Sequence, residues 1–267
     1  MRFSLVNGKK KEAEKGLTGI CIGCEQPMIP KCGGIKVKHW AHKSKCECDH
    51  WWENETEWHR AWKNHFPEDW QECFHLSETG ERHFADVKTA RGWVIEFQHS
   101  PLKREEFQAR NSFYRQIVWV VNGLRRKNDA KDFESSLRLM LSVNNNPLLQ
   151  RVFVITPNDH SILSEWEKNP IPVFYDFGQE HILWCRLPHR SGESDYILEF
   201  SRHAFIQLHK DVTSPKDVFA ELMEQLRLVA TEYSAKGKRE SEIRERGQSG
   251  YRFYPSNREI RRSSRRF

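Results

Sequence analysis

The sequence predicts a mixed α/β fold, and three observations support this prediction. Segments with helical periodicity alternate with short, strand-like segments between residues 51 and 122. A continuous apolar run at residues 116–121 is typical of a buried strand. The 267 residues are also enough for one large domain or two smaller ones, each with a core of its own. We therefore expect helices packed on a mixed sheet.

Residues 1–50 differ from the rest of the chain. They show little apolar periodicity and are rich in Cys, His, Gly and Lys, and five of the seven cysteines precede Asp49. The start of the chain has no apolar signal core, so we expect a cytoplasmic protein, in which thiols bind metal more readily than they form disulfides. The sequence therefore predicts a zinc-binding module at 1–50, where the metal substitutes for a hydrophobic core.

Two closely spaced ligand pairs stand out in this module. Cys21 and Cys24 form a CxxC pair, and His39 and His42 form an HWAH pair, with fourteen residues between the two pairs. Zinc prefers four tetrahedral nitrogen and sulfur ligands, which these pairs would supply in a closed, structural site. Spacing alone leaves the choice of ligands open, and an all-cysteine site or simple free thiols are the alternatives. The other candidates are Cys32, Cys46, Cys48 and His50.

Between residues 51 and 122 the elements follow the order helix, three strands, helix, strand. Aromatic residues at helical spacing predict a helix over 51–66, which Pro67 ends. Residues 70–76 are typical of a strand. Residues 103–115 form a second helix that is acidic at its start and basic at its end, as the helix dipole favours. The apolar run 116–121 is the last strand.

The other two strands form a hairpin over residues 86–98. An Ala-Arg-Gly loop joins them, and its glycine, Gly92, stands where a three-residue loop needs a positive φ. This loop pairs Thr89 with Trp93. That pair then sets which residues lie opposite one another along the rest of the hairpin.

In this register Asp86 lies directly across from Glu96. Because side chains alternate between the faces of a sheet, Phe84 and Lys88 share their face with Val94 and Gln98, whereas Ala85, Val87, Ile95 and Phe97 point to the other side. Two opposed carboxylates repel unless a cation lies between them. The hairpin therefore predicts a metal site, and the alternative is a pair of solvated acids on an exposed face.

The chain beyond residue 125 divides into an α/β region and a tail. The elements expected in the region are helices at 130–143 and 214–233 and strands at 151–156, 171–177 and 181–187. After residue 235 the chain has eleven Lys and Arg against four Asp and Glu, while the remainder is close to neutral. We expect this tail to be disordered, either as an arm that contacts a polyanion or as a solvated terminus.

Several motifs together resemble the competence protein CoiA-like nucleases of the PD-(D/E)XK superfamily. The resemblance covers about residues 21–123 and includes the order of elements described above. The motifs are the CxxC and HWAH pairs, Asn54-Glu55-Thr56-Glu57-Trp58-His59 with Lys63, His83-Phe-Ala-Asp86, Val94-Ile95-Glu96-Phe97-Gln98-His99-Ser100, Arg110, Tyr114 and Val118-Trp119-Val120-Val121.

The resemblance implies Cys21, Cys24, His39 and His42 as zinc ligands, and Asp86 and Glu96 as ligands of catalytic Mg²⁺ or Mn²⁺. The superfamily often has a lysine where this chain has Gln98. Glutamine carries no charge and takes up no proton, so Gln98 would orient a water molecule or the scissile phosphate.

Further polar residues are candidates for the same site. Glu55 and His59, four residues apart on the first predicted helix, are candidates for a further metal contact and for a phosphate or proton donor. The candidates for substrate binding are Lys63, His83, His99 and Arg110. The alternative is that these residues form ordinary surface pairs or snorkelling side chains.

The sequence therefore predicts four parts: a zinc module (1–50), a PD-(D/E)XK nuclease core (51–125), an α/β region of unknown role (126–235) and a basic disordered tail (236–267). We expect a metal-dependent nuclease that cleaves DNA rather than RNA, in recombination, repair, competence or defence against foreign DNA. The alternative is a zinc-containing nucleic-acid-binding protein with a vestigial site. Cysteine redox chemistry lacks the βαβ context that it requires, and we expect no membrane span.

Overall fold

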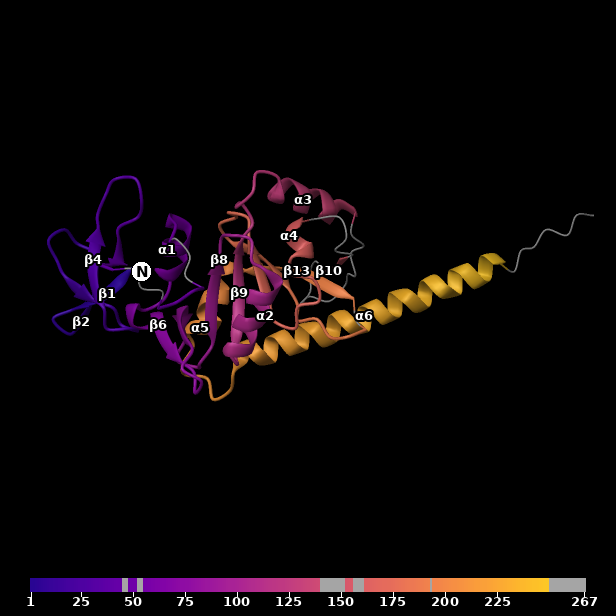
Figure 1. Ribbon diagram of the computed structural model, residues 1–267. Coiled ribbons are helices and arrows are strands. Elements are labelled where there is room, and N and C mark those ends of the chain that lie inside the picture. The colour runs from indigo at the N-terminus through magenta and orange to yellow at the C-terminus, as the bar shows by residue number, and fades with distance from the viewer. Residues whose placement is uncertain (45–47, 52–54, 140–151, 156–160, 193, 250–267) are drawn as a thin grey trace, which may run out of the picture.

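The computed structural model describes residues 1–44, 48–51, 55–139, 152–155, 161–192 and 194–249. Within this part of the chain the fold is mixed α/β, as predicted, with two sheets and six α-helices. The smaller sheet belongs to the N-terminal segment and lies at one end of the molecule, and the last helix extends away from the other end (Figure 1).

The N-terminal sheet has five antiparallel strands in the order β2-β1-β3-β4-β5. It buries only a small apolar cluster, with Met28 and Trp40 among its members. The sequence did not predict these strands, because their apolar residues are too few to show a period. The strands are β1 (Phe3–Val6), β2 (Lys9–Glu12), β3 (Gly19–Ile20), β4 (Pro27–Lys31) and β5 (His39–His42).

The large sheet has eight strands in the order β10-β13-β12-β11-β9-β8-β7-β6. The strands β8 and β9 run parallel, as do β9 and β11, and the other neighbours are antiparallel. The strands are β6 (Gln71–Leu76), β7 (Arg82–Lys88), β8 (Val94–Gln98), β9 (Ile117–Asn122), β10 (Val152–Ile155), β11 (Val173–Asp176), β12 (Ile182–Arg186) and β13 (Asp195–Ser201).

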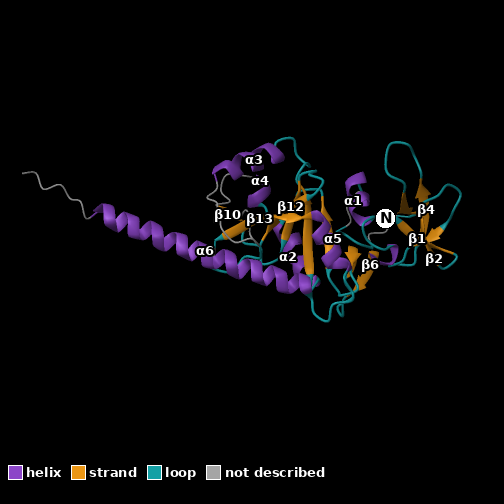
Figure 2. Cartoon of the chain, turned by 180° about the vertical axis from the view of Figure 1, so that it is seen from behind, coloured by secondary structure: helices purple, strands orange, loops and turns teal. Residues whose placement is uncertain are grey.

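Helices cover both faces of this sheet, so that it has two apolar cores (Figure 2). One core contains side chains of α1, α5 and α6, with Trp62 and Phe205 in contact. The other contains side chains of α2, α3 and α4 packed around Trp119 and Trp166. The helices are α1 (Glu57–Lys63), α2 (Arg104–Phe113), α3 (Asp129–Leu139), α4 (Ser161–Ser164), α5 (Arg202–Lys210) and α6 (Val218–Ser249).

The predicted order of helix, three strands, helix and strand is observed as α1, β6, β7, β8, α2 and β9, with a short 3₁₀ turn between α1 and β6. The central hairpin also has the predicted loop. The backbone N–H of Thr89 donates to the carbonyl of Trp93 at 2.8 Å, and Gly92 has φ +87°. Val87 pairs with Ile95, which is the predicted register.

Two aspects of the predicted organisation differ from the structure. Strands β9 and β11 are neighbours in one sheet, so the sheet continues across the boundary expected at residue 125. Residues 236–249, expected to be disordered, form the end of α6. They are rich in Lys, Arg and Glu, which have high helix propensity, and low apolar content therefore does not prevent a helix here. Residues 250–267 lie outside the described part of the chain.

None of the helices in the described ranges has both the length and the apolar character needed to cross a bilayer. The longest, α6, carries charged side chains along its length.

Candidate functional site

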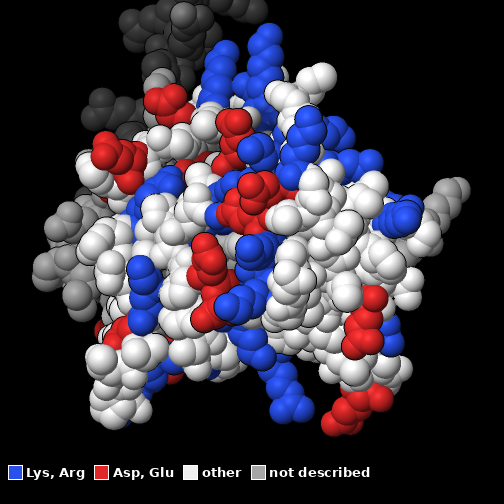
Figure 3. All heavy atoms as spheres, turned by 90° about the vertical axis from the view of Figure 1, so that its left-hand side faces the viewer, with Lys and Arg blue, Asp and Glu red and all other residues white. Residues whose placement is uncertain are grey.

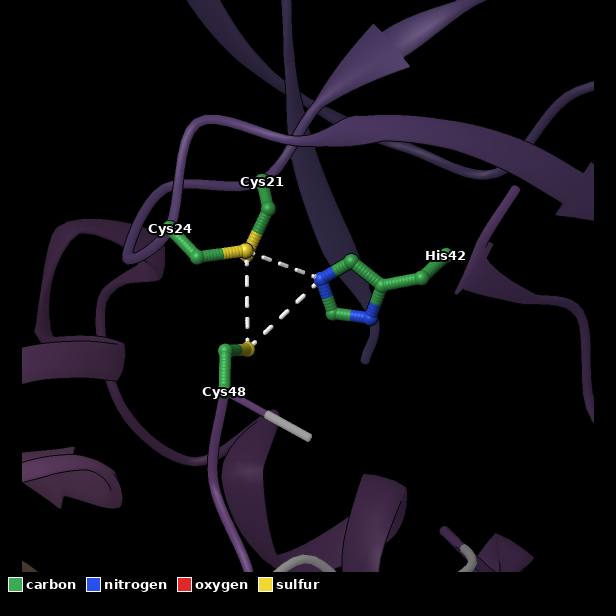
Figure 4. A group of neighbouring side chains, drawn as sticks. All are labelled: Cys21, Cys24, His42 and Cys48. Atoms are coloured by element: carbon green, nitrogen blue, oxygen red, sulfur yellow. Dashed lines mark hydrogen bonds between the residues drawn. The ribbon is translucent and has the colours of Figure 1, made fainter. Parts of the chain in front are cut away.

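A cluster of three cysteines and one histidine lies beside the N-terminal sheet (Figure 4). The Sγ atoms of Cys21 and Cys48 are 3.8 Å apart, and His42 Nε2 lies 3.2 Å from Cys24 Sγ and 3.6 Å from Cys48 Sγ. With Zn–S bonds of about 2.3 Å, two ligand sulfurs of a tetrahedral site lie roughly 3.8 Å apart. The four side chains therefore have the spacing of a structural zinc site.

The local backbone brings these ligands together. After Cys21 the chain turns back on itself, because Glu25 N–H donates to the Cys21 carbonyl at 3.0 Å and Cys21 N–H donates to the Gln26 carbonyl at 2.9 Å. His42 is the last residue of β5. A hydrogen bond with Cys48 lowers the pKa of Cys21 to about 4. The cluster thus favours a thiolate, the form of cysteine that binds metal.

The observed cluster differs from the predicted ligand set at one position. His39 lies three residues before His42 on β5, so it points to the other face of the strand, and its Nδ1 lies 2.9 Å from the Val37 carbonyl. Cys48, one of the open alternatives, completes the cluster. Cys32 donates to the Ala13 carbonyl instead, and Cys46 lies outside the described residues.

The two acids of the hairpin also lie together. Asp86 N–H donates to Glu96 Oε1 at 3.3 Å, and Phe97 N–H donates to Asp86 Oδ2 at 3.0 Å. Both carboxylates line a cavity of about 60 Å³ between the large sheet, α1 and the N-terminus. On the opposite side of the hairpin, Ile95 and Phe97 enter the apolar core as expected.

Ala85 is the exception to the predicted faces. It packs in the core on the α2 side, whereas Val87 packs in the core on the α1 side. Opposite Asp86 on β6, Glu72 has a φ of +47°, and residues 72 and 86 do not form a ladder pair, although the pairs on both sides of them keep one register.

Burial and the nearby Asp86 carboxylate raise the pKa of Glu96 to about 8, and the guanidinium of Arg110 opposes the rise. Arg110 Nη1 lies 3.1 Å from Glu96 Oε2, and its Nη2 donates to the Trp51 carbonyl at 2.8 Å. The acid pair is therefore held close at an electrostatic cost, which a bound cation would relieve.

Lys63, at the end of α1, lies in the middle of three carboxylates. Its Nζ is 2.7 Å from Glu55 Oε1, 3.2 Å from Glu72 Oε1 and 3.7 Å from Asp86 Oδ1. Only 3% of its side chain is exposed. Burial alone would lower the pKa of Lys63, but the carboxylates of Glu72, Asp86 and Glu55 raise it above its ordinary value. Lys63 is thus a buried counter-ion, not a snorkelling surface lysine.

Glu72 is an acidic residue of the cavity that the sequence pattern did not predict. Its carboxylate accepts the backbone N–H groups of Arg2 at 2.7 Å and Phe3 at 3.0 Å, so it ties β1 to the cavity. Burial would raise its pKa, yet Lys63 and these hydrogen bonds lower it to about 2. The sequence did contain one signal for Glu72, because it is a charged residue near the start of the strand predicted at 70–76.

Glu55 and His59 both line the cavity, although not as one helical pair. The helix α1 begins at Glu57 with Thr56 as its N-cap, so Glu55 precedes it. In a capping box, the backbone N–H of Thr56 donates to His59 Nδ1 at 3.3 Å and the backbone N–H of His59 donates to Thr56 Oγ1 at 3.3 Å, so one ring nitrogen of His59 is engaged at the helix start.

The remaining predicted residues have different surroundings. Gln98 is buried in the cavity wall, and its Nε2 donates to the Ser100 carbonyl at 2.8 Å. His99 Nδ1 lies 2.9 Å from the side-chain amide of Asn122. Arg110, expected to bind phosphate, faces Glu96 instead, and His83 is buried away from the cavity.

Asp49 connects the two sites, and nothing in the sequence indicated this. It follows Cys48 directly, lines the cavity, and accepts the backbone N–H of Phe84 at 2.8 Å. Its other oxygen lies 2.9 Å from His83 Nδ1. The residue after a cluster cysteine thereby holds the strand that carries Asp86.

The fold and the two sites define an α/β protein with a buried acidic cavity and a separate Cys₃His cluster. Residues 84–173 match the family described as competence protein CoiA, nuclease-like domain. The CoiA-like resemblance predicted from the sequence is confirmed in this segment, which includes Asp86, Glu96, Gln98 and Arg110 but neither Glu55 nor the Cys₃His cluster. The chain matched no curated protein and no solved structure.

Proposed function

We propose that the protein is a Mg²⁺-dependent nuclease of the PD-(D/E)XK kind that hydrolyses phosphodiester bonds in DNA. The proposal rests on one observation: Asp86 and Glu96 face the same cavity from neighbouring strands, within the segment that matches the CoiA nuclease-like domain. The order of α1, β6, β7, β8, α2 and β9 supports it.

The donor set of the cavity suits Mg²⁺. Its possible ligands are hard carboxylate oxygens, which Mg²⁺ and Mn²⁺ prefer. The ammonium of Lys63, held among Glu55, Glu72 and Asp86, is itself a cation at this position. The residues therefore fit a divalent ion, with Asp86 and Glu96 as ligands and Glu55 as a further contact.

The chain's own residues then have defined tasks. An ion held by Asp86 and Glu96 would supply a water molecule of lowered pKa and a positive charge for the phosphoryl oxygens. Lys63 pairs with Glu55, Glu72 and Asp86 and holds these carboxylates in place. Gln98 donates or accepts a hydrogen bond that aligns water, and Arg110 holds the carboxylate of Glu96 toward the cavity.

The cavity is small, with a volume of about 60 Å³. We therefore place the DNA strand across the mouth of the cavity, with a phosphate oxygen directed toward Asp86 and Glu96. Residues 1–44 contain nine Lys and Arg against three Asp and Glu. On the end of the molecule seen in Figure 3, Lys and Arg side chains alternate with Asp and Glu. Such cations would contact the phosphate backbone.

The second candidate function is nucleic-acid binding without catalysis. The observation that favours it is that Lys63 and Arg110 already form ion pairs with acids of the cavity, so these carboxylates are partly neutralised without a metal. The predicted zinc module (1–50) and the basic tail (236–267) would then bind the nucleic acid.

A cleavage assay distinguishes the two functions. We expect plasmid and single-stranded DNA to be cut in Mg²⁺ or Mn²⁺ but not in EDTA, and an RNA of the same length to be cut more slowly. Asp86→Ala and Glu96→Ala should each lower the cleavage rate at least 100-fold while DNA binding remains. Glu105→Gln, an exposed acid on α2, is the matched control. Full activity of Asp86→Ala would contradict the proposal, and binding without cleavage by the wild type would favour the second function.

A further inference from the structure

We propose that His50, Glu81 and His83 form a second metal site, for a divalent ion of the zinc class. One ligand atom of each residue lies within 4.8 Å of the others. None of them belongs to the Cys₃His cluster, and none lines the acidic cavity. Two imidazoles and one carboxylate are the ligand set of catalytic zinc sites, which keep a fourth position open.

His83 is the fixed ligand of this site. Its side chain is fully buried, and its ring is stacked on Trp51 with the centroids 3.2 Å apart. Nδ1 lies 2.9 Å from Asp49 Oδ1. Metal-binding histidines usually donate the N–H of the second nitrogen to a carboxylate, which orients the ring. When Nδ1 donates to Asp49, the lone pair of Nε2 is left for the ion.

Asp49 is itself held firmly in this orienting role. It also accepts the backbone N–H groups of Trp51 at 2.9 Å and Phe84 at 2.8 Å. The ring of His83 therefore has a defined position in advance of ion binding. This preorganisation is what distinguishes the group from a chance set of surface residues.

The other two ligands lie at the surface and are able to adjust. Glu81 Oε1 lies 2.9 Å from His83 Nε2, and 42% of the Glu81 side chain is exposed. His50 is exposed, with its ring centroid 5.0 Å from that of His83. Small side-chain rotations would bring both onto an ion bound at Nε2. Two imidazole ligands favour Zn²⁺, Co²⁺ or Ni²⁺ over Mg²⁺.

The same contacts have a simpler explanation, in which a charged His83 bridges Asp49 and Glu81 and no metal binds. The two explanations differ in metal stoichiometry. The test therefore measures zinc content, and its result does not depend on whether the protein cleaves DNA.

The full-length protein is saturated with Zn²⁺ in excess Mg²⁺, which occupies hard-oxygen sites, and then dialysed before zinc is measured by mass spectrometry. We expect Glu81→Gln and His50→Ala each to contain one zinc fewer than the wild type and to bind this ion at least tenfold more weakly by calorimetry. Glu78→Gln removes an exposed carboxylate from the same turn and should keep the full content.

Both variants change exposed side chains, so the fold should be retained. The Co²⁺-loaded variants report this directly, because thiolate-to-cobalt absorption from the Cys₃His cluster should equal that of the wild type. Equal zinc content in the wild type and in either variant would overturn the proposal.

Discussion

The Cys₃His cluster and the acidic cavity both gather potential metal ligands, but they differ in what contacts these ligands. In the cluster the ligand atoms of the four side chains face one another directly. In the cavity Lys63 lies among the carboxylates of Glu55, Glu72 and Asp86, and Arg110 contacts Glu96. The protein thus has one site whose potential ligands contact mainly one another and another whose carboxylates are partly neutralised by cations of the chain itself.

The proposed function offers a reason for this difference. A structural ion must stay bound, and soft thiolate ligands at tetrahedral spacing hold zinc tightly. An ion that assists hydrolysis must exchange ligands with water and substrate. Under the proposed function, internal cations would weaken the binding of this ion, and in its absence they offset part of the repulsion among Glu55, Glu72, Asp86 and Glu96.

The largest expected effect is at the cluster. Cys48→Ser should lose the zinc and destabilise the N-terminal sheet, since structural zinc in small domains contributes about 10–16 kcal/mol of binding energy. If the loss of zinc lowers the free energy of unfolding by about 4 kcal/mol, Tm falls by roughly 10 °C. Zinc content and thermal unfolding measure the effect. His39→Ala should keep its zinc. Loss of zinc from His39→Ala but not from Cys48→Ser would instead support the ligand set predicted from the sequence, which includes His39.

The next effect is at Lys63. Lys63→Met removes the cation that Glu55, Glu72 and Asp86 share, and breaking a buried ion pair costs about 3–5 kcal/mol. We expect added Mg²⁺ to restore part of this stability, although it changes the wild type little. Urea denaturation with and without Mg²⁺ measures both effects. Lys88→Met, which changes an exposed residue of β7, is the control. An equal loss of stability in Lys63→Met and Lys88→Met would show that Lys63 does not neutralise the cavity, and so would contradict the distinction drawn between the two sites.

The smallest effect is the pH dependence of Mg²⁺ binding. The pKa of Glu96 is raised to about 8, well above about 4.3 for an unfolded glutamate. Its favourable contribution to stability is therefore complete below about pH 4.3 and is lost as pH rises toward 8. Mg²⁺ must displace this proton, so its affinity should rise up to tenfold per pH unit below pH 8 and then level off.

Calorimetric titrations with Mg²⁺ between pH 6 and pH 9 measure this dependence. Glu96→Gln has no proton to lose and should bind Mg²⁺ weakly with little change across the range. A wild-type affinity independent of pH would indicate that Glu96 is already ionised in the metal-free protein.

Much of the hairpin was predictable because its geometry is local. The Ala-Arg-Gly loop sets the register, and strand alternation then places Asp86 opposite Glu96 from spacing along the chain alone. The continuous apolar run of β9 and the periodicity of α2 were predictable for the same reason. The catalytic roles of the two acids stay a proposal.

Other features depended on contacts between distant segments. Whether Cys48 or His39 completes the Cys₃His cluster depended on the path of the chain after β5, which brings Cys48 next to His42. The positive φ of Glu72 and the link through Asp49 left no pattern in the sequence. The strands of residues 1–31 have too few apolar residues to show a period.

Two-residue alternation and one turn glycine determined which acids share a face of the hairpin, because both act over a few neighbouring residues. Only the tertiary structure decided what surrounds those acids. Lys63 comes from α1, Glu72 from β6 and Arg110 from α2, and burial makes their charges act on one another. The charge balance of a buried site depends on such distant partners, which spacing along the chain does not reveal.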